Sequence, residues 1–360
     1  MESVYIHIPF CKSICSYCDF CKMYYHGPWV TKYLNALAKE VDERYEGEEI
    51  KTLYIGGGTP SSLTLKDIKY LFEIVGKFKL SSDCEVSFEC NLNDINEELL
   101  RTLKDCGVNR LSIGIESFNE DKLKFMERQH TYEEAKYAMK IARYYGFDNI
   151  NVDLMYGIPN ETLKDLKKDL DMILDLKPDH ISTYSLIVED HTKVGNMGII
   201  PIPEELDASM YELICDRLKK EKFIHYEVSN FGKEGKQSKH NLTYWDNREY
   251  YGFGMGAAGY IHGVRYENTK TLNDYFEGKW IKSQEILSKE DIMYNELMLG
   301  FRKMEGISLR NFYEKYGVNM QEAFDLREVL KEKELLVKDE YIFVNPKYIY
   351  VMNEILIKII

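Results

Sequence analysis

The sequence lacks the long apolar stretch that a membrane-spanning helix needs. None of its hydrophobic runs reaches the roughly 18 residues required to cross a bilayer. The first residues, MESVYIHIPFCK, also lack the basic region and apolar core of a signal peptide. We therefore expect a protein of the cytoplasm, with no membrane span.

An excess of positive charge is missing as well. The chain has 47 Lys and Arg residues against 60 Asp and Glu residues, which gives a net charge of −13. Because nucleic acids are bound by basic surfaces, this balance argues against a nucleic acid as the main partner. A length of 360 residues with 44% hydrophobic residues is typical of a globular protein with one large and one smaller domain.

Cysteines are few, but half of them are crowded together. Of the eight cysteines, four lie close to one another, at Cys11, Cys15, Cys18 and Cys21. The other four are scattered, which does not fit the disulfide framework of a small secreted protein. Crowding of this kind in a large chain favours a metal site.

Short apolar runs alternate with longer amphipathic stretches through the first part of the chain. The pattern predicts strands at 4–8, 52–55, 85–90, 110–115, 150–154 and 181–186, and helices at 30–45, 65–78, 97–105, 132–145, 163–176 and 204–220. Successive strand–helix units favour an α/β fold with a parallel sheet, either doubly wound or closed towards a barrel. The polar motifs follow the carboxyl ends of the strands, where a β/α barrel carries its chemistry.

The composition changes after residue 225. Residues 226–260 are rich in Gly, Asn, Tyr and Trp and are interpreted as functional loops. Helices are then expected at 291–304, 309–316 and 320–333, with strands at 335–337 and 341–344, in the outline of a winged helix. We predict a barrel core at 1–225, a loop-rich region at 226–288 that completes the barrel, and a small winged-helix-like domain at 289–360. From Ile281 to Ile360 there are 12 Lys and Arg residues against 14 Asp and Glu residues, so a basic DNA-binding face is not expected.

Cys11, Cys15 and Cys18 have the spacing C-x3-C-x2-C. Three thiolates can each bind one iron of a 4Fe-4S cubane, which leaves the fourth iron open. S-adenosylmethionine (SAM) can chelate that iron through its amino and carboxylate groups, and an electron from the cluster then cleaves it to a 5′-deoxyadenosyl radical. The alternatives are free thiols or a zinc site with Cys21 as fourth ligand, although structural zinc ligands usually form two pairs with a longer spacer.

Other motifs follow the next predicted strands. The glycine triplet of GGGTP at 56–60 allows a ligand to approach the backbone, or it is a plain turn. Glu89, Glu116 and Asp153 end three successive strands. Acidic side chains in apolar strands need partners, such as ribose hydroxyls or an amine. Helix capping or pairing with a neighbouring Arg is the alternative for each.

Together these motifs resemble the radical SAM family of oxygen-independent coproporphyrinogen III dehydrogenases and their relatives. The resemblance runs nearly end to end, through YIHIPFC at 5–11, the cysteine loop, GGGTP, GVNRLSIG at 107–114, and the segments 153–159, 226–231 and 240–245. It implies a partial parallel (β/α) radical SAM barrel with a 4Fe-4S cluster on the three cysteines.

The resemblance also implies residues that bind SAM. Those matching the site of the cluster-bound SAM are Tyr5, Gly57 and Glu89, and those matching a second SAM site are Tyr17, Gly58, Thr59, Arg128 and Asp153. His7 and His130 would line or support this pocket. Glu116 stands where the family has Gln, and a carboxylate cannot donate a hydrogen bond as an amide does.

Three features favour the heme-chaperone branch of the family. The dehydrogenases resemble C-x3-C-x2-C-x-C, whose fourth cysteine would fall at Phe20. They also carry a long N-terminal extension, whereas the first strand is expected here at residue 4. The segment HNLTYW at 240–245 resembles the H-N-x-x-Y-W signature of the chaperones. His240 would then bind heme iron, although a hydrogen-bonded structural histidine is the alternative.

The resemblance thus implies a protein that keeps the cluster and SAM, binds heme and delivers it to receiving proteins, with an electron donor as a further partner. Two other functions stay open. One is SAM-dependent oxidative decarboxylation of coproporphyrinogen III to protoporphyrinogen IX. The other is a radical SAM reaction on another tetrapyrrole or an unrelated substrate.

Overall fold

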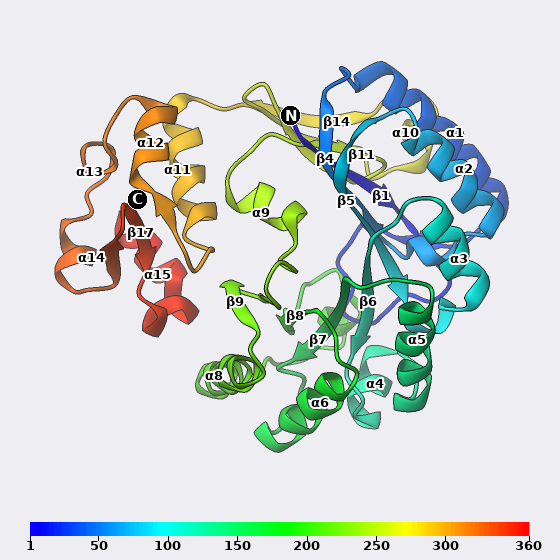
Figure 1. Ribbon diagram of the computed structural model, residues 1–360, viewed down its shortest axis with the longest axis horizontal. Coiled ribbons are helices and arrows are strands. Elements are labelled where there is room, and N and C mark those ends of the chain that lie inside the picture. Colours follow the sequence, from blue (N-terminus) through cyan, green and yellow to red (C-terminus); the bar gives the residue numbers. More distant parts are fainter. Residues whose placement is uncertain (360) are drawn as a thin grey trace.

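A curved nine-stranded sheet forms the centre of the computed structural model, which describes residues 1–359 (Figure 1). The strand order is β11-β1-β4-β5-β6-β7-β8-β10-β9. Its six central strands run parallel and in chain order: β1 (Ser3–Ile8), β4 (Glu49–Gly57), β5 (Lys79–Asn91), β6 (Arg110–Glu116), β7 (Ile150–Tyr156) and β8 (His180–Ser185). All six predicted strands are therefore confirmed.

Helices connect these strands and cover the outside of the curve (Figure 1). They are α1 (Gly27–Arg44), α2 (Leu65–Val75), α3 (Glu97–Asp105), α5 (Tyr132–Tyr144), α6 (Leu163–Asp175) and α8 (Glu204–Lys220), each within three residues of its predicted bounds. Thr131 and Thr162 begin two of them with capping boxes, which satisfy the free N–H groups of the first turn. Because helices cover the sheet, its strands are apolar almost throughout.

The region after β8 adds strands to both edges of the sheet. At one edge β10 (Asn230–Gly232) pairs antiparallel with β8 and with β9 (Ile224–Glu227), and at the other β11 (Tyr251–Phe253) pairs parallel with β1. A separate antiparallel sheet contains β12 (Ala258–Ile261), β13 (Val264–Asn268) and β14 (Ile281–Ile286). The connection from β13 to β14 includes the short helix α10 (Leu272–Phe276).

The interpretation of residues 226–260 as loops is wrong for much of this segment. It contains β10, β11, most of β12 and the helix α9 (Lys239–Trp245), which lies within the curve of the main sheet (Figure 1). Strands of three residues and a seven-residue helix are too short to show a period in the sequence.

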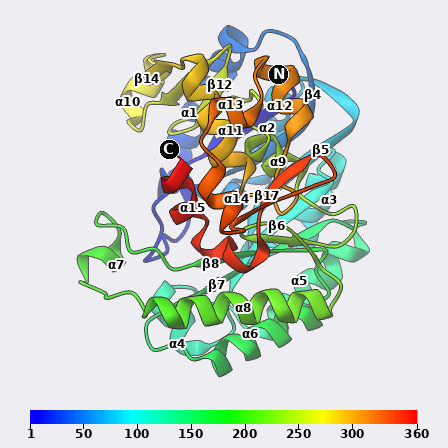
Figure 2. The same ribbon diagram turned by 90° about the vertical axis from the view of Figure 1, so that its left-hand side faces the viewer.

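The chain ends in a small domain on the open side of the curved sheet (Figures 1 and 2). Its elements are α11 (Lys289–Gly300), β15 (Ile307–Ser308), α12 (Leu309–Tyr316), α13 (Met320–Ala323), α14 (Arg327–Lys331), β16 (Leu335–Lys338), β17 (Tyr341–Val344), the 3-10 helix η3 (Pro346–Val351) and α15 (Met352–Ile359). The helix predicted at 320–333 is broken in two, because Phe324 is extended and packs into the core.

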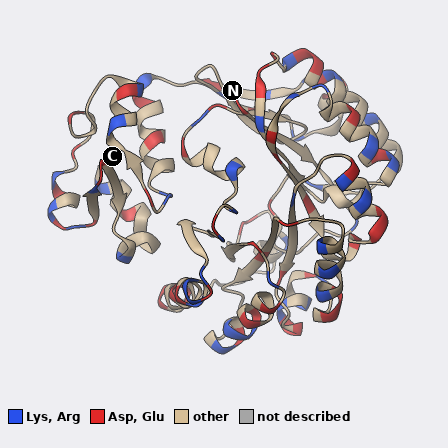
Figure 3. Ribbon diagram, viewed as in Figure 1, with Lys and Arg blue, Asp and Glu red and all other residues tan. Residues whose placement is uncertain are grey.

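Acidic and basic residues are interspersed along the helices of this domain without a long run of one sign (Figure 3). No helix within residues 1–359 is both long and apolar enough to cross a membrane.

Candidate functional site

A cavity of about 570 Å³ lies at the carboxyl ends of the parallel strands. Most of the residues predicted from the sequence line it: Cys11, Cys15, Tyr17, Cys18, Gly57, Gly58, Thr59, Glu89, Glu116, Arg128 and Asp153. They come from the cysteine loop, from β4 to β7 and from the segment after α4 (Glu120–Met126), and Asp153 lies in the middle of β7 rather than at its end. Tyr5 and His240 do not line the cavity.

The cysteine loop is held at its base and at its middle. Cys11 ends β2 (Phe10–Cys11), which pairs with β3 (Met23–Tyr24) on the far side of the loop. Between them, the Ser16 N–H and hydroxyl donate hydrogen bonds to the carbonyl oxygens of Met126 and Phe125 in α4. The loop therefore presents Cys11, Cys15 and Cys18 to one cavity.

The thiols of this loop have few hydrogen bonds within the protein. The Thr59 hydroxyl donates to Cys11 Sγ and Arg128 Nη1 donates to Cys15 Sγ, each over 3.4 Å. Burial raises the pKa of the Cys11 thiol to about 11 and also raises the pKa of Cys18. Since metals bind thiolates, bound iron would add positive charge that stabilises the deprotonated form of these buried thiols.

Three thiols in one cavity fit the ligand set of a 4Fe-4S cluster with one open iron. Within residues 1–359, no three Cys, His, Asp or Glu side chains converge as ligands of a single metal ion. A cubane does not need that convergence, because each thiolate binds a different iron. Cys21 faces elsewhere: a Cβ atom on Gly256 would lie 2.8 Å from its Sγ atom. A zinc site made by all four cysteines would require Cys21 to leave this position.

The two glycines that end β4 are packed too closely for other residues. A Cβ atom on Gly56 would lie 2.7 Å from the Glu89 carboxylate, and one on Gly57 would lie 2.4 Å from the His7 ring. Gly57 also has a positive φ of 114°. Its N–H donates to Glu89 Oε2 over 3.0 Å, and the Tyr54 hydroxyl donates to Glu89 Oε1 over 2.9 Å. Burial raises the pKa of Glu89, which these two donors partly offset.

A further wall of the cavity carries Glu116, Arg128 and Asp153. Glu116 has a left-handed backbone (φ 68°), and its Oε1 lies 3.9 Å from Arg128 Nη1. Arg128 also donates to the carbonyl of Gly114, while its buried Nε has no partner within residues 1–359. Burial and the nearby Glu116 carboxylate raise the pKa of Asp153 to about 8. This wall therefore has polar groups available for a ligand.

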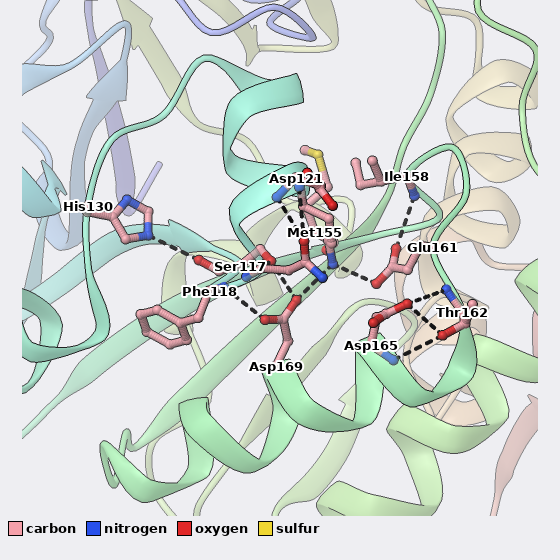
Figure 4. A network of polar contacts seen from close by, with 12 residues as sticks. Ser117, Phe118, Asp121, His130, Met155, Ile158, Glu161, Thr162, Asp165 and Asp169 are labelled. Atoms are coloured by element: carbon pink, nitrogen blue, oxygen red, sulfur yellow. Dashed lines mark hydrogen bonds and ion pairs between the residues drawn. The ribbon is translucent and has the colours of Figure 1, made fainter.

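A buried ionic network that the sequence did not predict supports this wall (Figure 4). Lys122 Nζ donates to Glu161 Oε1 over 2.6 Å, to Asp169 Oδ2 over 2.9 Å and to the Met155 carbonyl. Asp169 also accepts a hydrogen bond from the hydroxyl of Ser117, the neighbour of Glu116, and one from the backbone N–H of Phe118. The network thus fixes the end of β6, and no local sequence pattern connects residues so far apart.

His240 lies on α9 and not, as expected, in a polar loop. It is 1% exposed, and both ring nitrogens are engaged, Nδ1 with the Thr52 hydroxyl and Nε2 with the Tyr244 hydroxyl, each over 2.8 Å. Burial and the Arg110 charge lower its pKa to about 3. Its role as a heme ligand stays a prediction, and it requires one nitrogen to be released.

Tyr5 lies beneath the cavity and not in its lining. Its hydroxyl is 3.0 Å from His7 Nδ1, and its ring stacks on Tyr54, with ring centroids 6.2 Å apart. His7 Nε2 in turn contacts the Cys21 carbonyl over 2.7 Å. The predicted supporting role of His7 agrees with this position, whereas His130 lines the cavity itself.

Comparison with known proteins agrees with this site. Residues 5–173 match the radical SAM superfamily, and residues 287–346 match the HemN C-terminal domain. The heme chaperones HemW of Lactococcus lactis and Bacillus subtilis are 39% and 40% identical to the chain. The first alignment covers 94% of this chain and 91% of the relative, and the second covers 94% of each.

The solved structure of coproporphyrinogen III oxidase (HemN) from Escherichia coli superposes with a TM-score of 0.87. That alignment covers 99% of this chain and 89% of HemN at 21% identity, so it confirms the fold. The cofactors of the radical SAM family are a 4Fe-4S cluster and SAM, which the residues of the cavity fit. The chain therefore belongs to the radical SAM superfamily and, within it, to the family of the heme chaperone HemW.

Proposed function

We propose that this protein is a heme chaperone, which binds heme and delivers it to receiving proteins while its cavity holds the cluster and SAM. The observation that carries the proposal is the cavity itself, with three thiols, a close glycine turn and carboxylates at strand ends. It occurs in a chain about 40% identical to two heme chaperones along nearly its whole length. Phe20, at the place of the fourth cysteine of the oxidases, departs from the oxidase pattern.

Apolar side chains at the mouth of the cavity support heme binding there. Phe20 and Ile187 line the cavity and are 67% and 70% exposed. A porphyrin is flat and mostly apolar, so such a surface favours it. His191 lies beside this mouth, where it pairs with Asp19 of the cavity lining, and its side chain is 66% exposed. Its imidazole is accessible to heme iron, whereas that of His240 becomes accessible only after a rearrangement.

Heme titration of the anaerobically reconstituted protein, with and without SAM, tests the proposal. We expect saturable binding with a distinct Soret band, followed by transfer to a heme-free acceptor such as apomyoglobin. His240→Ala and His191→Ala, titrated in parallel, show which imidazole binds the iron. A wild-type protein without saturable heme binding would contradict the proposal.

The alternative reaction has its own assay. Coproporphyrinogen III is incubated with the reconstituted protein, SAM and a reductant under anaerobic conditions. We expect no sustained formation of protoporphyrinogen IX, and continued turnover would make the protein an oxidase instead.

Two further partners belong to this proposal. Reduction of the cluster needs a one-electron donor, and free thiols persist in a reducing compartment. We therefore propose that the protein works in the cytoplasm with such a donor and with heme-receiving proteins.

A further inference from the structure

Three side chains in contact, those of His240, Tyr54 and Glu89, connect α9 with the cofactor cavity. The imidazole of His240 stacks on the ring of Tyr54, with ring centroids 5.3 Å apart and an interplanar angle of 29°. The hydroxyl of Tyr54 donates to Glu89 Oε1, while Gly57 N–H donates to Oε2. His240 therefore lies two contacts from a carboxylate of the cavity.

The ring of His240 has a fixed orientation. Because the Thr52 hydroxyl donates to Ser3 Oγ over 2.9 Å, it accepts from Nδ1–H of His240. Nε2 then accepts from the hydroxyl of Tyr244. This assignment leaves no ring nitrogen free, so the face of the imidazole cannot turn away from Tyr54 without the loss of both hydrogen bonds.

Helix α9 is itself anchored at both ends. Glu85 of β5 accepts hydrogen bonds from the backbone N–H groups of Lys239 and His240. Just beyond the helix, Asn247 donates to the carbonyl of Ile292 in the C-terminal domain, over 3.0 Å. Hydrogen bonds to both the barrel and the C-terminal domain therefore hold α9, and with it His240, in place.

We propose that His240 is a positioning residue for the cofactor cavity, where it acts through Tyr54 to orient the Glu89 carboxylate towards the cluster-bound SAM. The inference rests on the predicted role of Glu89 in holding SAM. The hydrogen bond from Tyr54 favours one orientation of the carboxylate, and the His240 face keeps the Tyr54 ring in place. The HNLTYW motif then serves the SAM site, whether or not it also contacts heme.

A double-mutant cycle on the cluster-loaded protein tests this inference. Equilibrium dialysis with labelled SAM gives the Kd of wild type, His240→Ala, Tyr54→Phe and the double variant, and EPR of the reduced cluster reports SAM binding independently. Glu89→Gln is the reference for loss of the carboxylate. His262→Ala is the matched control, because His262 is a histidine on the exposed turn after β12.

We expect SAM affinity to fall about tenfold in Tyr54→Phe and about fivefold in His240→Ala. The double variant should bind SAM no more weakly than Tyr54→Phe alone, because His240 acts through the lost hydroxyl. Iron content should match wild type in all of them. If His240→Ala folds poorly, His240→Gln is measured in the same way, since it keeps hydrogen-bonding groups but loses the ring face.

Three outcomes would overturn the inference. One is an unchanged SAM Kd in the His240 variant. Another is a double variant whose fold loss of SAM affinity equals the product of the two single losses. The third is loss of iron with loss of His240, which would place its effect on the cluster. A heme titration of the same variants keeps the questions apart: a protein that never binds heme refutes the proposed function, while the SAM cycle still decides the role of His240.

Discussion

The cysteine loop and helix α9 both carry residues expected to bind iron, but they differ in how far the protein satisfies those residues. In the loop, the thiols of Cys11 and Cys15 each receive one long hydrogen bond, and they face a cavity. In α9, His240 is almost fully buried and both its ring nitrogens have close protein partners. Both segments carry strong sequence motifs.

A sequence motif therefore marks important residues without stating what each of them does. Ligand groups that face a cavity without partners are available to a metal, because a bound metal supplies what the protein withholds. A fully hydrogen-bonded side chain in the interior instead holds its neighbours in place. The loop therefore has the features of a cofactor site, and α9 has those of an anchor.

If the cysteine loop is the cofactor site, removal of one cavity thiol should abolish the cluster. Cys15→Ser removes a cavity thiol, so we expect the anaerobically reconstituted protein to lose its iron and its brown colour. Cys21→Ser, from the same loop, should retain about four irons per chain, since three thiolates are sufficient for the cluster. Iron analysis checks both variants. Loss of iron in Cys21→Ser, or zinc in the wild type, would refute the assignment.

The buried network of Lys122, like His240, is fully engaged with protein partners, so it should contribute to stability. Lys122→Met leaves Glu161 and Asp169 without their cation, and we expect the free energy of unfolding to fall by about 3–5 kcal/mol. Lys124→Met, on the exposed face of the same helix, should change it by less than about 0.5 kcal/mol. Denaturant unfolding measures both. Similar values for the two variants would mean that the network adds little stability.

The buried His240 also predicts a pH dependence. Its pKa falls from 6.5 in the unfolded chain to about 3 in the fold, so between these values the unfolded state binds more protons. The free energy of unfolding should therefore decrease as the pH falls through this window, by up to about 1.4 kcal/mol per pH unit. His240→Gln should show a shallower slope than wild type. The exposed His26→Gln is the control, and equal slopes in all three proteins would argue against a neutral, buried His240.

The smallest expected effect concerns the C-terminal domain. Its acidic and basic residues are nearly balanced, so we expect no salt-dependent affinity for duplex DNA. Fluorescence anisotropy at low and high salt measures this. Tight binding that weakens steeply with salt would overturn the expectation.

Much of the fold and part of the site could be predicted from the sequence. The six parallel strands were recognisable because buried parallel strands are apolar almost throughout. The cysteine spacing and the acidic strand ends likewise depend on short segments, and the structure brings these residues to one cavity.

The environment of His240 could not be predicted in the same way. Its partner Thr52 lies 188 residues away in the chain, and only the packing of α9 against β4 brings them together. The same holds for Lys122, whose carboxylate partners are 39 and 47 residues distant. Such contacts depend on tertiary packing, which no local period or motif records.

The EPR spectrum of the reduced, reconstituted wild-type protein, recorded with and without SAM, shows whether the cluster has an open iron. If Cys11, Cys15 and Cys18 hold a cluster with one open iron, SAM should coordinate that iron and change the spectrum, and Glu89→Gln should weaken the response. A spectrum that stays the same at saturating SAM would show that no iron is open to it. That result would contradict the central claim about the cavity.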